Sequence, residues 1–146
     1  MKPKRILAAV DLTPASTPAL NEALEQALAD GAELLIAHAY QPPSLIQADS
    51  FAAGVYEEWD QNLKTDVTAK LRPLVEDARK RGINARPLVL TGAPYEAISE
   101  AAKKNKVDLV VMGTHGRTGV SRFFVGSVAS RVISTAPCPV LTVRAG

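Results

Sequence analysis

Hydrophobic residues follow two alternating patterns along this chain. Short, mainly apolar runs, such as Ile6 to Val10 and Leu34 to Tyr40, are typical of strands buried on both faces of a parallel sheet. Between these two runs, apolar residues recur at three- and four-residue spacing from Leu20 to Leu28, which is the period of an amphipathic helix. The pattern therefore indicates strands alternating with helices.

Continued to the C-terminus, this pattern predicts one α/β domain over residues 1–146, with a Rossmann-like, open and mostly parallel sheet and helices on both faces. Proline, Gly54 and the lack of any period indicate a loop over residues 42–55, longer than most connections in compact domains. The expected strands are 6–10, 34–40, 85–91, 107–112 and 140–143. Four helices are expected between them. They run from Ser16 or Thr17 to about 30, from about 56 to 81, from about 94 onward, and from near 126 to 136.

The composition of the chain bears on two questions: which kinds of partner the protein binds and in which cellular compartment it works. The formal charge is only +2 and the charged residues are spread along the sequence, so we expect neither a nucleic-acid partner nor a membrane surface. We find no apolar run long enough for an export signal or a membrane span, so no membrane insertion is expected. A single cysteine, Cys138, fits a reducing compartment, and the expected location is the cytoplasm.

A glycine-rich segment, GTHGRTGVSRFFVGS, follows the fourth predicted strand and occupies residues 113–127. A strand, a glycine loop and a helix in this order present backbone N–H groups and a helix dipole to an anion, most simply a phosphate. Gly113, Gly116 and Gly126 would let the backbone approach that anion, and Ser127 would add a hydroxyl group. Arg117 lies where it would neutralise phosphate charge, whereas His115 fits a phosphate contact and a solvated loop equally well.

The first strand-to-helix turn, Asp11 to Ser16, contains no glycine, which excludes both a P-loop and a dinucleotide fingerprint there. Ligands of open α/β sheets bind at the carboxyl ends of strands, where the strand order reverses. If the first and fourth strands are neighbours, Asp11 and Gly113 flank one crevice, and the carboxylate would meet a ribose hydroxyl or a phosphate-bound Mg²⁺. The alternatives are that Asp11 only caps the first helical turn, and that the glycines only allow a surface loop to turn.

Together these motifs resemble the ATP-binding branch of the universal stress protein family. The resemblance covers the whole chain, and its motifs are Lys4-Arg5-Ile6-Leu7 through Asp11, Ala37-His38, Gly92-Ala93-Pro94, Val107 through Gly116, Gly126-Ser127, and Ala136 through Val143. It implies a five-stranded parallel sheet in the order 3-2-1-4-5 and a homodimer. It also implies an adenine nucleotide (ATP, ADP or AMP), with Mg²⁺ as a further candidate, between the ends of strands 1 and 4.

The resemblance also assigns roles to individual residues. Asp11 would contact the ribose, and the backbone around Val10, Ala39 and Met112 would contact the adenine. One position departs from the family pattern, because Ala129 stands where relatives often carry a hydroxyl residue that contacts phosphate. The residues implied to contact ribose and phosphates are Gly113, Gly116, Gly126 and Ser127.

Three functions fit these features. The first is a regulatory stress-response protein that reads adenine nucleotide as a homodimer, which would pair residues 140–143 with their copy across a two-fold axis. The second is slow ATP hydrolysis or autophosphorylation, although no catalytic residue or protein metal ligand is assigned and Asp11 is the one acidic residue placed in the crevice. The third is a dimeric adaptor that holds nucleotide as a structural ligand.

Overall fold

The computed structural model of the chain describes residues 2–41, 53–114 and 126–145. Five parallel strands form one sheet in the order β3-β2-β1-β4-β5, which confirms both the predicted α/β class and the predicted strand order. Their bounds are β1 Arg5–Ala9, β2 Glu33–Tyr40, β3 Ala85–Thr91, β4 Leu109–Gly113 and β5 Val140–Val143.

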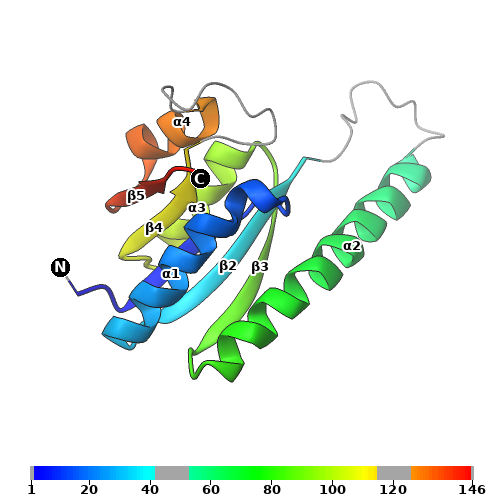
Figure 1. Ribbon diagram of the computed structural model, residues 1–146. Coiled ribbons are helices and arrows are strands. Elements are labelled where there is room, and N and C mark those ends of the chain that lie inside the picture. Colours follow the sequence, from blue (N-terminus) through cyan, green and yellow to red (C-terminus); the bar gives the residue numbers. More distant parts are fainter. Residues whose placement is uncertain (1, 42–52, 115–125, 146) are drawn as a thin grey trace.

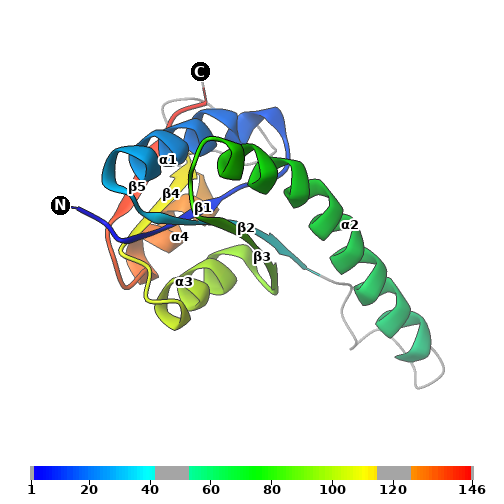
Figure 2. The ribbon, with the colours of Figure 1, turned by 90° about the horizontal axis from the view of Figure 1, so that it is seen from below.

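Helices cover both faces of this sheet, as Figure 2 shows. The helices α1 and α2 pack on one face, over a core that includes Ile6, Leu34 and Leu71. The helices α3 and α4 pack on the opposite face, over a second core that includes Leu7 and Val110. The helical segments are a short 3₁₀ turn η1 Pro14–Ser16, α1 Thr17–Asp30, α2 Ala53–Lys80, α3 Pro94–Lys104 and α4 Ser127–Thr135.

The expected element bounds need small corrections. The helix α2 begins at Ala53, so Gly54 and Val55 are helical and are not part of the loop predicted over residues 42–55. Glycine has low helix propensity, which hid this first turn from the sequence pattern. The strand β4 begins at Leu109 rather than at residue 107, because the Asp108 carboxylate accepts hydrogen bonds from the Lys4 and Arg5 amides just before the two strands pair.

Topology fixes where a ligand would meet this sheet. The chain leaves β1 on the side of β2 and β3, then crosses back through α3 to β4 on the other side of β1 (Figure 1). The strand order therefore reverses between β1 and β4, and their carboxyl ends lie side by side, with Ala9 opposite Met112. Within the described residues, no helix is long and apolar enough to cross a membrane.

Candidate functional site at the carboxyl edge of the sheet

Val10, the last residue of the first predicted strand, lies just beyond β1. Two hydrogen bonds join it to residues of β2. Its amide donates to the Ala37 oxygen at 2.8 Å, and its carbonyl oxygen lies 2.7 Å from Nδ1 of His38. Because a carbonyl accepts hydrogen bonds, Nδ1 carries the proton in this contact. His38 is 91% buried, since its exposed fraction is 9%. This hydrogen bond holds the main chain immediately before Asp11.

Asp11 organises the turn that follows β1. One carboxylate oxygen, Oδ1, accepts hydrogen bonds from the Thr13 amide at 2.9 Å, the Thr13 hydroxyl at 2.7 Å and the Ser16 hydroxyl at 2.7 Å. Ser16 is the N-cap residue of α1 but makes no side-chain capping bond; its hydroxyl donates to Asp11 and accepts from the Asp11 amide at 3.2 Å. These three bonds orient the carboxylate of Asp11, and the N-cap residue of η1 is Thr13 rather than Asp11.

Leu12 takes a left-handed backbone conformation, with φ of 63°, in the middle of this turn. Such a conformation is unfavourable for a branched, bulky side chain, and residues of this kind cluster at functional sites. Leu12 also packs against the core under α1 and α2, which offsets part of that cost. No glycine or asparagine stands at this position, so a left-handed backbone could not be predicted from the residue type.

The end of β4 carries the next two predicted residues. Met112 is 5% exposed and lies opposite Ala9 of β1 and Thr142 of β5. Gly113 is half-buried and pairs with Val143, and the following Thr114 amide donates to the Val143 oxygen at 3.1 Å. The main chain is therefore hydrogen-bonded to β5 as far as Thr114, the second residue of the glycine-rich segment.

The start of α4 returns to this same point. The Gly126 amide donates to the Thr114 oxygen at 2.5 Å, so the first residue of the helix cap lies beside the end of β4. Gly126 has φ of −63° and ψ of 161°, an extended conformation that any residue adopts. A positive φ is therefore not what requires glycine at this position. Close approach of another group, the reason given above, stays a prediction.

The first turn of α4 starts beside the end of β4. The Ser130 amide is the first to bond within the helix, to the Gly126 oxygen at 3.0 Å, so the amides of Ser127, Val128 and Ala129 precede the helical ladder. The cap makes no side-chain hydrogen bond, and Ser127 is exposed. These amides and the positive end of the helix dipole form an arrangement that favours an anion.

The remaining predicted residues divide into two groups. Ala39 lies near the carboxyl end of β2, opposite Leu90 of β3, and is half-buried, so it belongs to the same edge. His115, Gly116 and Arg117 lie outside the described residues. The structure thus brings Val10, Asp11, Ala39, Met112, Gly113, Gly126 and Ser127 to one edge of the sheet.

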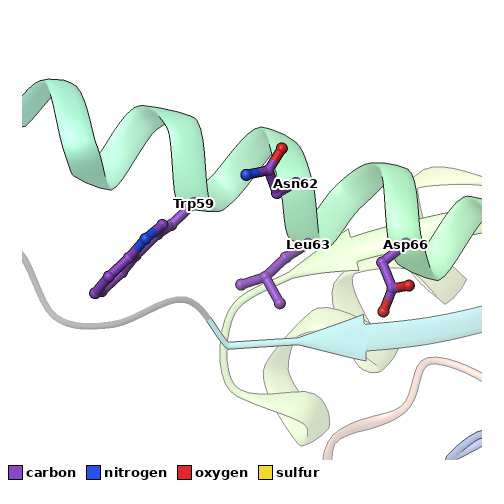
Figure 3. Close-up of a pocket in the computed structure, with 4 residues that line it drawn as sticks. All are labelled: Trp59, Asn62, Leu63 and Asp66. Atoms are coloured by element: carbon purple, nitrogen blue, oxygen red, sulfur yellow. The ribbon is translucent and has the colours of Figure 1, made fainter.

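Trp59 lies on the exposed part of α2. It is 53% exposed and lines a surface hollow with Asn62, Leu63 and Asp66, with Leu63 and Asp66 directed toward β2 (Figure 3). The charged residue of this hollow is a carboxylate, which disfavours an anionic ligand there. In the part of the chain that the structure describes, no group of three or more His, Cys, Asp or Glu side chains is placed to hold a metal ion.

Several known proteins are similar to this chain in sequence and in fold. A universal stress protein of Thermus aquaticus is 38% identical over 142 residues, covering 97% of this chain and 98% of the relative. The solved structure of the MJ0577 protein of Methanocaldococcus jannaschii superposes with a TM-score of 0.87 at 23% identity, covering 99% and 97% of the two chains. A solved universal stress protein in complex with cAMP has a TM-score of 0.73 at 28% identity, covering 100% of each chain.

A family-level comparison agrees with these individual likenesses. The universal stress protein family model matches residues 2–144, nearly the full length. The match, the full-length relative and the strand order agree with the resemblance found from the motifs. The chain belongs to the universal stress protein family.

Proposed function

We propose that this protein binds an adenine nucleotide at the carboxyl edge of the sheet, between β1 and β4, and acts as a regulatory protein of the stress response. The observation that carries the proposal is the position of the α4 N-terminus, whose cap residue Gly126 is hydrogen-bonded to Thr114 directly after β4. A helix start beside a strand end is suited to phosphate binding. The related universal stress protein solved with cAMP supports an adenine nucleotide as the ligand.

Each residue at the edge has a role in this proposal. The phosphates meet the amides at the start of α4, together with Ser127 and the glycine backbone at Gly113 and Gly116. The ribose meets Asp11, whose Oδ1 is oriented by Thr13 and Ser16. The adenine meets the main chain around Val10, Ala39 and Met112. Mg²⁺, where present, is held mainly through the phosphates, with Asp11 as the candidate protein ligand.

Binding is favoured over catalysis as the primary activity. Phosphoryl transfer needs acidic metal ligands and a group that positions the nucleophile. Asp11 is the acidic residue that we assign to the site, and its Oδ1 is occupied by three hydrogen bonds that hold the turn. We further propose that the protein works in the cytoplasm as a homodimer paired through β5.

Thermal unfolding with added nucleotide tests the proposal. A ligand at roughly 100 times its dissociation constant adds about 2.7 kcal/mol, which raises the Tm of a domain of this size by about 5–10 °C. We expect such a shift with at least one of ATP, ADP and AMP, measured with and without Mg²⁺. Nucleotide released from heat-denatured protein, identified by mass spectrometry, would name the ligand carried through purification.

Gly126→Val is the test variant, because a branched side chain there would occupy the space that the phosphate needs while the extended backbone tolerates it. Gly54→Val is the matched control, since a Cβ at Gly54 meets nothing within 4 Å. We expect the nucleotide-induced shift to disappear in the first variant and to persist in the second. Equal nucleotide-induced Tm shifts in both variants would show that the phosphate does not bind at the start of α4. No Tm shift in the wild type would reject nucleotide binding altogether.

A further inference from the structure

The fold gathers basic residues at the edge of the sheet opposite the proposed nucleotide site. This amino edge comprises residues 2–6, 27–34, 77–86 and 101–109, which are the beginnings of β1 to β4, the last turns of α1, α2 and α3, and the connections between them (Figure 1). It holds ten of the 17 basic residues of the chain and four of the 15 acidic residues, giving a formal charge of +6 within a total of only +2. The even spread of charge along the sequence hides this separation.

The basic residues of the amino edge are of two kinds. All four arginines have partners: Arg5 and Arg86 bind Glu33, Arg79 donates to the Ala85 oxygen and Arg81 pairs with Asp77. The six lysine side chains are exposed and have no hydrogen bond or ion pair within the described residues; they are Lys2, Lys4, Lys80, Lys103, Lys104 and Lys106.

Helix dipoles explain only part of this distribution. Lys80, Lys103 and Lys104 lie in the last turns of α2 and α3, where a positive charge is favourable. Lys2 and Lys4 precede β1 and belong to no helix. Some further reason is needed for the charge of the amino edge as a whole.

Lys106 supplies an independent observation. It has φ of 53°, in the left-handed region, directly after the cap residue Asn105 of α3. Glycine or asparagine is usual at such a position, and a lysine there adds backbone strain. Within the described residues no side-chain hydrogen bond or ion pair of Lys106 offsets this cost, so its ammonium group is left for a partner outside the chain.

We propose that the amino edge is a docking surface for the anionic face of a phospholipid membrane. Ammonium groups on long flexible stems give strong but non-directional attraction, whereas directional recognition of a folded acidic partner relies more on guanidinium groups, which are already committed here. Non-directional attraction suits a membrane surface, because its anionic headgroups present a density of negative charge rather than one fixed arrangement of acceptors. The protein would lie on the membrane, with the carboxyl edge of its sheet directed away from the lipid.

Sedimentation with lipid vesicles tests this surface directly. We expect binding to phosphatidylcholine vesicles that contain about 30% phosphatidylserine, and none to phosphatidylcholine alone. Binding should weaken strongly between about 0.05 M and 0.5 M salt, because exposed charges are screened. Each lysine near such a surface contributes about fivefold in affinity, so Lys103→Gln, Lys104→Gln and Lys106→Gln together should weaken binding roughly a hundredfold.

A control with the same net charge separates the amino edge from charge in general. Lys64→Gln, Lys70→Gln and Arg144→Gln together remove three charges from other described regions and should weaken binding much less. Equal losses in the two triple variants, or binding that ignores phosphatidylserine, would overturn the proposal. Stronger dependence on these lysines for binding to double-stranded DNA than to vesicles would also overturn it, in favour of a nucleic-acid partner.

The single variant Lys106→Gly separates function from stability. Glycine relieves the left-handed strain, so we expect its Tm to equal or exceed that of the wild type while vesicle affinity falls about fivefold. Unchanged vesicle affinity in this folded variant would show that Lys106 does not contact the membrane, which would contradict the proposal at the residue that supports it independently. The test needs no nucleotide, so its outcome is separate from that of the proposed function.

Discussion

The side chain of His38 makes one hydrogen bond within the described residues, from Nδ1 to the Val10 oxygen. This bond crosses from β2 to the residue before Asp11, at a place where the regular pairing between β1 and its neighbours has ended at Ala9. A buried carbonyl that loses its partner costs about 1–3 kcal/mol. The histidine is therefore expected to act mainly through this bond rather than through packing.

Two substitutions at His38 distinguish bonding from packing. Leucine fills a similar volume without a donor, whereas asparagine places an amide donor near the position of Nδ1 but leaves a small cavity. We expect His38→Leu to lower the free energy of unfolding by about 1–3 kcal/mol and His38→Asn to lower it less. Urea unfolding followed by circular dichroism measures both. A larger loss for asparagine than for leucine would show that packing dominates.

At the scale of elements, the amino ends of three neighbouring strands are joined through one carboxylate. Glu33 of β2 accepts from Nε of Arg5 in β1 and from Nε of Arg86 in β3, both at 2.9 Å. The same two arginines bind the backbone oxygen and the side-chain oxygen of Asn105, at 2.6 Å and 3.2 Å. One acidic residue thus ties three strands to the connection between α3 and β4.

This cluster makes stability depend on pH. The hydrogen bond from Arg86, opposed by burial and supported by Arg5, holds the pKa of Glu33 below its ordinary value of 4.5. A carboxyl group whose pKa is lowered by folding stabilises the protein above its unfolded pKa and loses that contribution as pH falls through the folded pKa. The contribution of Glu33 is therefore expected to be complete near neutral pH and to vanish in acid, below 4.5.

The variant Glu33→Gln tests this linkage. Ion pairs that are partly open to solvent contribute modestly, so we expect a loss of about 1 kcal/mol in the free energy of unfolding near neutral pH. The difference from the wild type should shrink steadily once the pH falls below 4.5, the ordinary pKa of a glutamate. Urea unfolding at a series of pH values measures it. A difference that stays constant across this range would mean that the carboxylate charge is not the stabilising feature.

Elements and their order were predictable from the sequence, whereas their contacts at the two edges were not. Buried strands such as Leu34 to Tyr40 are recognisable because a parallel sheet buries both faces. The left-handed backbone of Leu12 and the bond from His38 to Val10 depend on tertiary packing, which no local pattern encodes. The charge of the amino edge likewise arises only when distant lysines meet.

The whole molecule has an open sheet, and β5 forms one of its two edges. The Pro139 and Val143 oxygens accept hydrogen bonds from the Val110 and Thr114 amides of the neighbouring chain segment. Since successive residues of a strand direct their peptide groups to opposite sides, those of Val140 and Thr142 face outward. Leu141 is 36% exposed as well, so this edge can pair with a second copy.

Thr142→Pro tests the proposed homodimer. Proline removes an outward N–H and blocks pairing across the edge, yet it leaves the bonds between β4 and β5 in place, as edge prolines do in other sheets. We expect the wild type to have the mass of a dimer and the variant that of a monomer in light scattering after gel filtration. Val143→Pro is the matched control, because it removes an inward N–H and should instead lower the Tm. If Thr142→Pro remains dimeric while still folded, the subunits associate through another surface.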